Sequence, residues 1–198
     1  MKQIISKEEI NRLLKIKGKV RGIVIKNLQG FLIKEEGQGG LKKLEDTMEK
    51  LGHPMESNIK SMGFYSLGQE ALLLVIIKKL FGYNDKKFQE LGAFESKRAT
   101  IIETLIKYFI SPRKVVKEAS RFWRKYYTVG DLEVTDFNKK EKSLIVRIKN
   151  FNYIKEGCQI FVGFFPNVVR LVFGSKASCE EIKCTYKGDE AHEFLLKW

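Results

Sequence analysis

The chain is poor in proline, cysteine and histidine, with three, three and two copies among 198 residues. Three cysteines cannot all pair, so the disulfide framework that holds many small secreted domains together is not expected. No apolar run approaches the roughly 20 residues that cross a bilayer, since the longest covers only residues 71–77. The opening turns polar at Ser6, which argues against a secretory signal. We therefore expect a cytoplasmic protein without a membrane span.

Negative charge is also scarce, because 24 acidic residues face 37 Lys and Arg and leave a net charge of +13. Such a balance would suit nucleic acid or an anionic membrane face. However, the lysines are spread along the whole chain and mixed with acids, a pattern also typical of heat-adapted surfaces. A nucleic-acid-binding module is therefore an alternative that we do not favour.

Motifs of the common catalytic classes are missing. Residues 37–40 read Gly-Gln-Gly-Gly but lack the Lys-Ser/Thr of a phosphate-binding loop. We find no nicotinamide or flavin fingerprint and no Ser, His and Asp arrangement for nucleophilic catalysis. Neither histidine lies on a clear helical face that would direct it at a haem. We expect a protein that is not an enzyme.

The order of predicted elements is mostly helices followed by mostly strands. With 43% hydrophobic residues, the chain can bury one sizeable core, so we expect a single ligand-binding domain over residues 1–198. Within it, residues 1–128 are expected to be mainly helical and residues 129–198 mainly strands. This order predicts an α+β fold with a helical layer packed on an antiparallel sheet. Helices are expected at about 7–17, 27–36, 41–51, 69–81, 84–108, 111–126 and 157–174, and strands at 19–25, 132–137, 144–148, 179–186 and 193–198.

Four side chains that can bind metal lie near the C-terminus: Cys158, Glu181, Cys184 and His192. Thiolate and imidazole are preferred ligands of zinc, and a carboxylate can complete a four-coordinate shell. The spacing of Glu181 and Cys184 lets both converge after a local bend, and a Gly-Asp turn can fold His192 back beside them. Four protein ligands leave no open position, so such a site would be structural. The alternative is that the two cysteines are small buried hydrophobic residues.

The C-terminal third resembles the 4-vinyl-reductase domain, a small-molecule-binding module of bacterial and archaeal regulators. Members carry a cysteine, glycines soon after it, a Glu-x-x-Cys motif and a closing Cys or His after a Gly-rich turn. The matching positions here are Cys158, Gly163, Gly174, Glu181, Cys184, Gly188 and His192. In zinc-binding members the ligands correspond to Cys158, Glu181, Cys184 and His192, the last being more often cysteine. The resemblance therefore implies a structural zinc ion as cofactor.

The N-terminal two thirds is similar to a related uncharacterised bacterial family, known mainly from myxobacteria. The matching stretches are 17–20, 65–67, 90–92 and 122–127. Both families are similar to the ligand-binding fold shared by haem-nitric-oxide sensors and small subunits of Golgi tethering complexes. That fold is again a helical layer against an antiparallel sheet.

The resemblance implies a non-catalytic sensor or carrier that holds a small apolar or aromatic ligand. Trp123 and Phe165 are the residues that we expect to line its apolar pocket. It also implies a homodimer formed through the N-terminal helices, and a protein partner that receives any signal. The alternatives are a metal-free scaffold subunit similar to those of trafficking complexes, the nucleic-acid-binding module, and, ranked last, an enzyme of tetrapyrrole metabolism.

Overall fold

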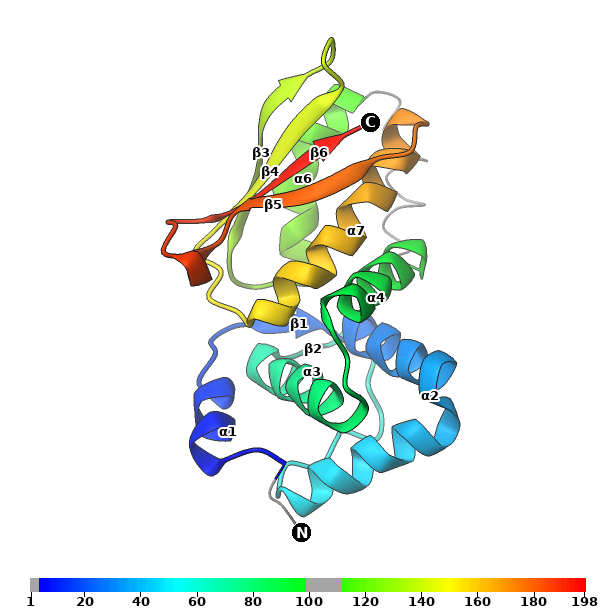
Figure 1. Cartoon of the computed structure of the whole chain (residues 1–198). Coiled ribbons are helices and arrows are strands. Elements are labelled where there is room, and N and C mark those ends of the chain that lie inside the picture. Colours follow the sequence, from blue (N-terminus) through cyan, green and yellow to red (C-terminus); the bar gives the residue numbers. More distant parts are fainter. Residues whose placement is uncertain (1–3, 99–111) are drawn as a thin grey trace. The chain divides into compact units, whose positions relative to one another are not determined.

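The computed structural model describes residues 4–98 and 112–198, and the chain divides into two units, Met1–Asn84 and Asp85–Trp198. The first unit contains α1 (Lys7–Leu14), β1 (Lys19–Arg21), α2 (Gly22–Lys50), β2 (Phe64–Ser66) and α3 (Leu67–Phe81), as Figure 1 shows. As the sequence predicts, Ser6 caps α1, because its Oγ accepts a hydrogen bond from the Glu9 N–H over 3.1 Å.

The core of the first unit is built around α3, the most apolar helix. Nearly every residue from Leu67 to Ile77 is buried, so this helix is covered on all sides rather than on one face. α1 and α2 pack against it and contribute aliphatic and aromatic side chains. The largest fully buried members of this core are Leu13, Leu28, Phe31, Leu32, Leu44, Leu67, Leu72, Leu74, Ile76 and Ile77.

The expected strand at 19–25 is wrong beyond Arg21, where α2 begins. The first two backbone donors of α2, on Gly22 and Ile23, bond the carbonyls of Gly63 and Ser61 over 2.8 and 3.0 Å. These long-range bonds satisfy N–H donors at the start of the helix, which have no partner within it. The local periodicity of the sequence does not predict such bonds. The short strand β2, which pairs with β1 in antiparallel register, was not predicted either.

The two helices expected at 27–36 and 41–51 meet at a kink within the segment α2. It is interrupted only at Gly37, whose φ of 71° and ψ of −177° lie outside the helical region. Glycine accepts this positive φ without the steric cost of a side chain. The glycine-rich residues 37–40 thus separate two helices, as the sequence predicts.

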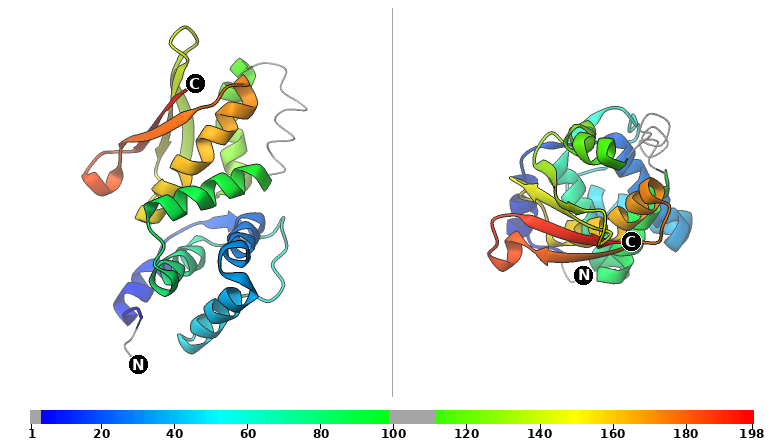
Figure 2. Two further views of the ribbon diagram at one scale, coloured as in Figure 1. Left: turned by 45° about the vertical axis from the view of Figure 1, so that its right-hand side comes forward. Right: turned by 90° about the horizontal axis from the view of Figure 1, so that it is seen from above.

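The second unit contains α4 (Asp85–Arg98), α6 (Pro112–Tyr126), β3 (Asp131–Asn138), β4 (Ser143–Lys149), α7 (Lys155–Phe173), β5 (Ser178–Lys183), the short 3₁₀ helix η1 (Thr185–Lys187) and β6 (His192–Lys197). Its four antiparallel strands lie in the order β3-β4-β6-β5. α6 contacts β3, and α7 contacts β5 and β6, so the two helices cover one face of the sheet (Figure 1, Figure 2). The α+β class with a helical layer on an antiparallel sheet is confirmed.

The helix expected at 84–108 is seen as α4 up to Arg98, and its continuation lies outside the described residues. α4 crosses α7 closely, because each helix presents a glycine to the backbone of the other. A Cβ on Gly92 would lie 1.9 Å from the Ile160 carbonyl oxygen, and one on Gly163 would lie 1.9 Å from that of Gln89. Only glycine permits this approach.

Candidate functional site

The four side chains with metal-binding chemistry come from three elements of the second unit and one turn. Cys158 lies in the first turn of α7, and Glu181 lies on the face of β5 that points to the helices, opposite Phe194. Cys184 follows β5 directly and caps η1, while His192 is the first residue of β6. The sheet and α7 therefore meet at this point.

These four residues converge on one another. Cys158 Sγ lies 3.9 Å from Cys184 Sγ and 3.5 Å from His192 Nδ1. His192 Nδ1 lies 3.2 Å from Glu181 Oε1. One ligand atom from each residue can be chosen so that all four lie within 4.8 Å of one another. The structure thus brings together all four residues that the sequence selected, although whether they bind a metal stays a prediction.

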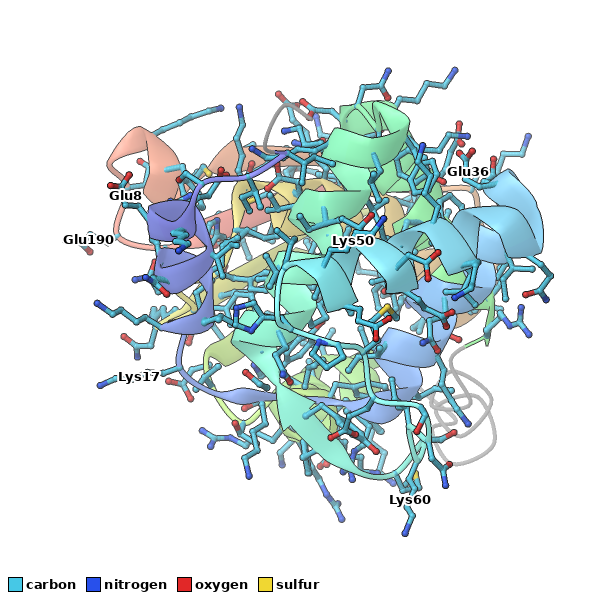
Figure 3. The ribbon with its side chains drawn as sticks, turned by 90° about the horizontal axis from the view of Figure 1, so that it is seen from below. Glu8, Lys17, Glu36, Lys50, Lys60 and Glu190 are labelled. Carbon is cyan, nitrogen blue, oxygen red and sulfur yellow. The ribbon has the colours of Figure 1, made fainter. Side chains whose placement is uncertain are left out.

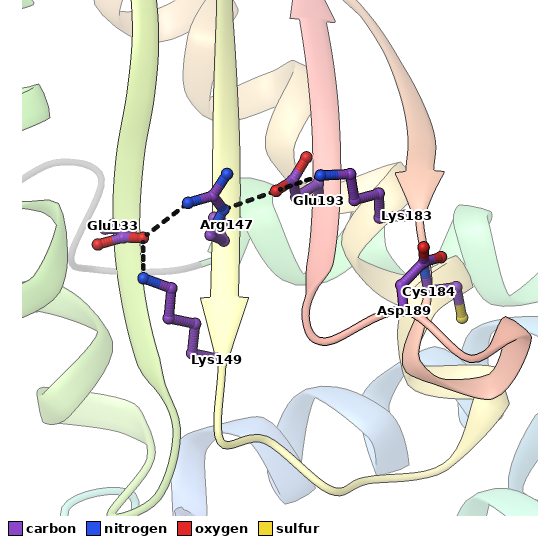
Figure 4. A network of polar contacts seen from close by, with 7 residues as sticks. All are labelled: Glu133, Arg147, Lys149, Lys183, Cys184, Asp189 and Glu193. Atoms are coloured by element: carbon purple, nitrogen blue, oxygen red, sulfur yellow. Dashed lines mark hydrogen bonds and ion pairs between the residues drawn. The ribbon is translucent and has the colours of Figure 1, made fainter.

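Two further residues hold this arrangement in place. Thr185 Oγ1 lies 2.9 Å from His192 Nε2, so the second ring nitrogen also has a hydrogen-bonding partner. The Cys184 N–H donates to Asp189 Oδ2 over 2.8 Å, and Figure 4 shows both residues beside the sheet. Such contacts fix the orientation of a ligand side chain. The sequence did not predict these supporting roles, and the only signal was the place of both residues in the turn between Cys184 and His192.

Burial shapes the protonation of the cluster. Cys158 is 4% exposed, and burial, followed by the charge of Glu181, raises the pKa of its thiol far above the usual range. Burial also acts to raise the pKa of Glu181, but hydrogen bonds from His192, Cys158 and Cys184 outweigh it and lower that pKa. The carboxylate is thus the anion of the cluster, and a cation that bound here would have to displace the Cys158 proton.

The neighbouring candidates are separated from the cluster by the register of β5. Glu180 is exposed on the other face of the sheet, which selects Glu181 as the inward carboxylate. Cys179 shares the inward face with Glu181 but lies opposite Leu196, farther from the turn, and it is not among the four converging residues. Burial raises the pKa of its thiol to about 12.

The opposite face of the sheet carries a row of alternating charges across all four strands, Glu133, Arg147, Glu193 and Lys183 (Figure 4). Arg147 Nε donates to Glu193 Oε1 over 2.6 Å, and Lys183 Nζ lies 3.3 Å from the same oxygen. The Glu193 side chain is only 5% exposed. Because Glu193 follows His192, this row helps to fix the start of β6 from the face opposite the cluster.

The expected pocket residues lie in an aromatic cluster beneath the sheet. Trp123 stacks on Tyr127 at 4.4 Å between ring centroids, and its Nε1–H donates to the Val129 carbonyl over 2.9 Å. Phe165 stacks on Phe161 at 5.6 Å and meets Phe194 edge-on at 5.3 Å. Both residues are buried, and their role in ligand binding stays a prediction.

The arrangement of elements is similar to that of solved H-NOX structures. An H-NOX protein from S. oneidensis, in its Fe(II) ligation state, matches with a TM-score of 0.69 and 12% identity over 89% of this chain and 95% of its own. An oxygen-binding H-NOX domain related to soluble guanylate cyclases matches with a TM-score of 0.62 and 11% identity over 89% and 94%. The chain has the H-NOX fold. No protein-family model and no curated protein matches the sequence.

The H-NOX comparison corrects the expected cofactor. Two other similar structures are described by the redox potential and the distortion of their heme, and the S. oneidensis proteins by their iron. The prediction of a structural zinc ion as the cofactor is therefore wrong for this fold. The expectation of zinc rested on a ligand pattern, and a pattern of thiols and imidazole does not by itself select the metal.

The histidines of this chain do not fit a haem. His192 is 4% exposed and both of its ring nitrogens face partners inside the cluster, so neither points at a cavity. His53 lines a cavity of about 30 Å³ between α2 and α3, together with Met48, Ile59 and Glu70. Small-molecule sites typically measure about 300–1,000 Å³, so this space suits a water molecule and not a porphyrin.

No described helix is both long and apolar enough to cross a membrane.

Proposed function

We propose that this chain is a non-catalytic sensor or carrier domain for a small apolar ligand, and that Cys158, Glu181, Cys184 and His192 form a structural metal site that braces it. The observation that carries the metal site is the convergence of two thiols, one carboxylate and one imidazole within 4.8 Å. The H-NOX fold and the resemblance to the 4-vinyl-reductase domain support the ligand-binding role.

The spacing of the sulfurs supports this proposal. Metal–sulfur bonds of about 2.3 Å at a tetrahedral ion would separate two sulfurs by about 3.8 Å. The distance between Cys158 Sγ and Cys184 Sγ is 3.9 Å. Bound there, a soft divalent ion would join the start of α7 to the end of β5 and the start of β6. It would also offset two of the three negative charges of a carboxylate and two thiolates, which are costly to bury without a cation.

The experiment is metal analysis and Co²⁺ titration of the full chain, purified without an affinity tag under reducing conditions. We expect about one ion per chain in the wild type and in the control variant Cys179→Ala, with the absorption of tetrahedral Co²⁺–thiolate after exchange. Cys184→Ala should lose both the ion and the absorption. Absence of metal and of Co²⁺ uptake in the wild type would remove the metal site and leave the cysteines as core residues.

The ligand-binding role has a separate test. We propose that Trp123 and Phe165 line the pocket, because they belong to the aromatic cluster between α6, α7 and the sheet. An environment-sensitive naphthalene dye should bind the wild type and Phe165→Leu with different affinities, and should quench the emission of Trp123 in a Trp198→Phe background. If affinity and quenching are the same in Phe165→Leu, the pocket does not include this residue.

We propose further that two copies pair through the N-terminal helices and that the signal passes to a partner protein by contact. Sedimentation equilibrium of the full chain tests the first point, since a dimer would show a concentration-dependent mass. A mass equal to the monomer at all concentrations would exclude the homodimer.

A further inference from the structure

An exposed apolar turn precedes β2 in the first unit. The Gly63 N–H donates to the Lys60 carbonyl over 2.9 Å and closes the turn, which displays Met62 with 75% of its surface exposed. Arg21 Nη1 donates to the Met62 carbonyl over 2.6 Å, and the Lys60 N–H donates to Tyr65 Oη over 2.7 Å. Together with the bonds from the first turn of α2, these contacts hold the turn rigidly.

A second apolar side chain stands beside it. Phe64 is 37% exposed, and the Arg21 guanidinium lies 4.0 Å from its ring centroid across the β1–β2 pair. A Cβ on Gly22 would lie 2.2 Å from the Lys60 carbonyl oxygen. The turn therefore packs against the backbone of α2 at a position where a side chain would not fit. Holding methionine and phenylalanine in water adds nothing to the stability of the fold. Held in fixed positions beside basic residues, they are available for a contact outside the chain.

Basic residues predominate in the two segments beside the turn, which lie between Glu9 and Glu35 and between Glu56 and Glu70. Residues 10–34 contain Arg12, Lys15, Lys17, Lys19, Arg21, Lys26 and Lys34 and no acid, and residues 57–69 contain Lys60 and no acid. Lys17, Lys19 and Lys60 are exposed, and Figure 3 shows Lys17 and Lys60 pointing outward from the ribbon. The basic turn surface, defined as Lys17, Lys19, Arg21, Lys60, Met62 and Phe64, thus combines a positive field with two apolar side chains.

We propose that the basic turn surface binds anionic lipid bilayers. Basic residues near an anionic membrane each strengthen binding by roughly fivefold, and exposed apolar side chains add to this by entering the interface. Nucleic acid fits less well, because Met62 has no aromatic face for base stacking and Arg21 covers one face of Phe64. Two apolar side chains are also too few for the core of a stable protein–protein interface.

The experiment is cosedimentation of the full chain with vesicles of phosphatidylcholine, alone or mixed with phosphatidylglycerol. We expect binding only to the mixed vesicles, and weaker binding as salt is raised. Met62→Ser should weaken it about tenfold and Lys60→Gln about fivefold. The matched controls are Lys50→Gln and Ile182→Ser. Lys50 is an exposed lysine in the last turn of α2, and Ile182 is an apolar residue on β5 that is 41% exposed. Both should stay within about twofold of the wild type.

Three outcomes would overturn the proposal. Absence of binding to the mixed vesicles would exclude a lipid surface. Equal losses in Lys60→Gln and Lys50→Gln, with none in Met62→Ser, would show attraction by diffuse charge without a specific surface. Binding to duplex DNA that Met62→Ser weakens, without binding to vesicles, would assign the surface to nucleic acid. Circular dichroism of each variant checks that folding is unchanged.

Discussion

The two units of the chain bury different kinds of residue. The first unit encloses an almost entirely aliphatic core around α3, and its described buried polar residues are Asn27 and Glu70. The second buries stacked aromatic rings and, among its described residues, Glu95, Ser96, His192 and Glu193, besides the two thiols. Aliphatic burial serves stability alone, whereas buried polar groups cost free energy unless partners satisfy them. Most of the described buried polar groups, and both buried thiols, therefore lie in the second unit.

The largest expected effect tests the packing that supports the second unit. In Gly92→Ala, the new Cβ would meet the Ile160 carbonyl and force α4 away from α7. We expect the free energy of unfolding to fall by about 3–5 kcal/mol, as for severe overpacking. Guanidinium chloride titration followed by circular dichroism measures this.

The matched control is Gly39→Ala in α2, where a Cβ would meet nothing within 4 Å. Alanine is favoured over glycine in a helix, so this variant should gain up to about 1 kcal/mol. Equal stability of Gly92→Ala and the wild type would show that the α4–α7 crossing can open without cost.

The same contrast explains what the sequence could predict. α3, β4 and α7 were recognised because their apolar residues follow a helical or strand period. The four clustered residues were selected by chemical type and family spacing. β2, the start of α2 at Gly22 and the roles of Thr185 and Asp189 depend on hydrogen bonds whose partners are distant in sequence or hidden in a turn. Local sequence patterns therefore do not predict these bonds.

A medium effect concerns the pH dependence that Glu95 imposes on the second unit. Glu95 is 8% exposed, and burial raises its pKa to about 8. Between the unfolded pKa of 4.5 and the folded value, the native state holds a proton that the unfolded chain releases. Stability should therefore fall as pH rises through this window, by about 1.4 kcal/mol for each pH unit.

The variant Glu95→Gln removes this dependence. At pH below 4.5 it should match the wild type, and at pH 7 it should be more stable by roughly 3.5 kcal/mol. The control is Glu90→Gln on the exposed side of α4, which should stay within about 0.5 kcal/mol at both values. Thermal unfolding across pH measures the effect. A wild type whose stability is flat from pH 5 to 8 would mean that Glu95 is solvated.

The smallest effect concerns the charged row on the outer face of the sheet. Glu193→Gln keeps the shape of the side chain but removes the charge between Arg147 and Lys183. Because the carboxylate is 5% exposed and accepts charge-assisted hydrogen bonds, we expect a loss of about 1–2 kcal/mol, smaller at high salt. Glu133→Gln, at the exposed end of the row, should cost less than about 1 kcal/mol. Equal losses would show that the row acts through surface charge alone, and no position within it would then fix the start of β6 beside His192.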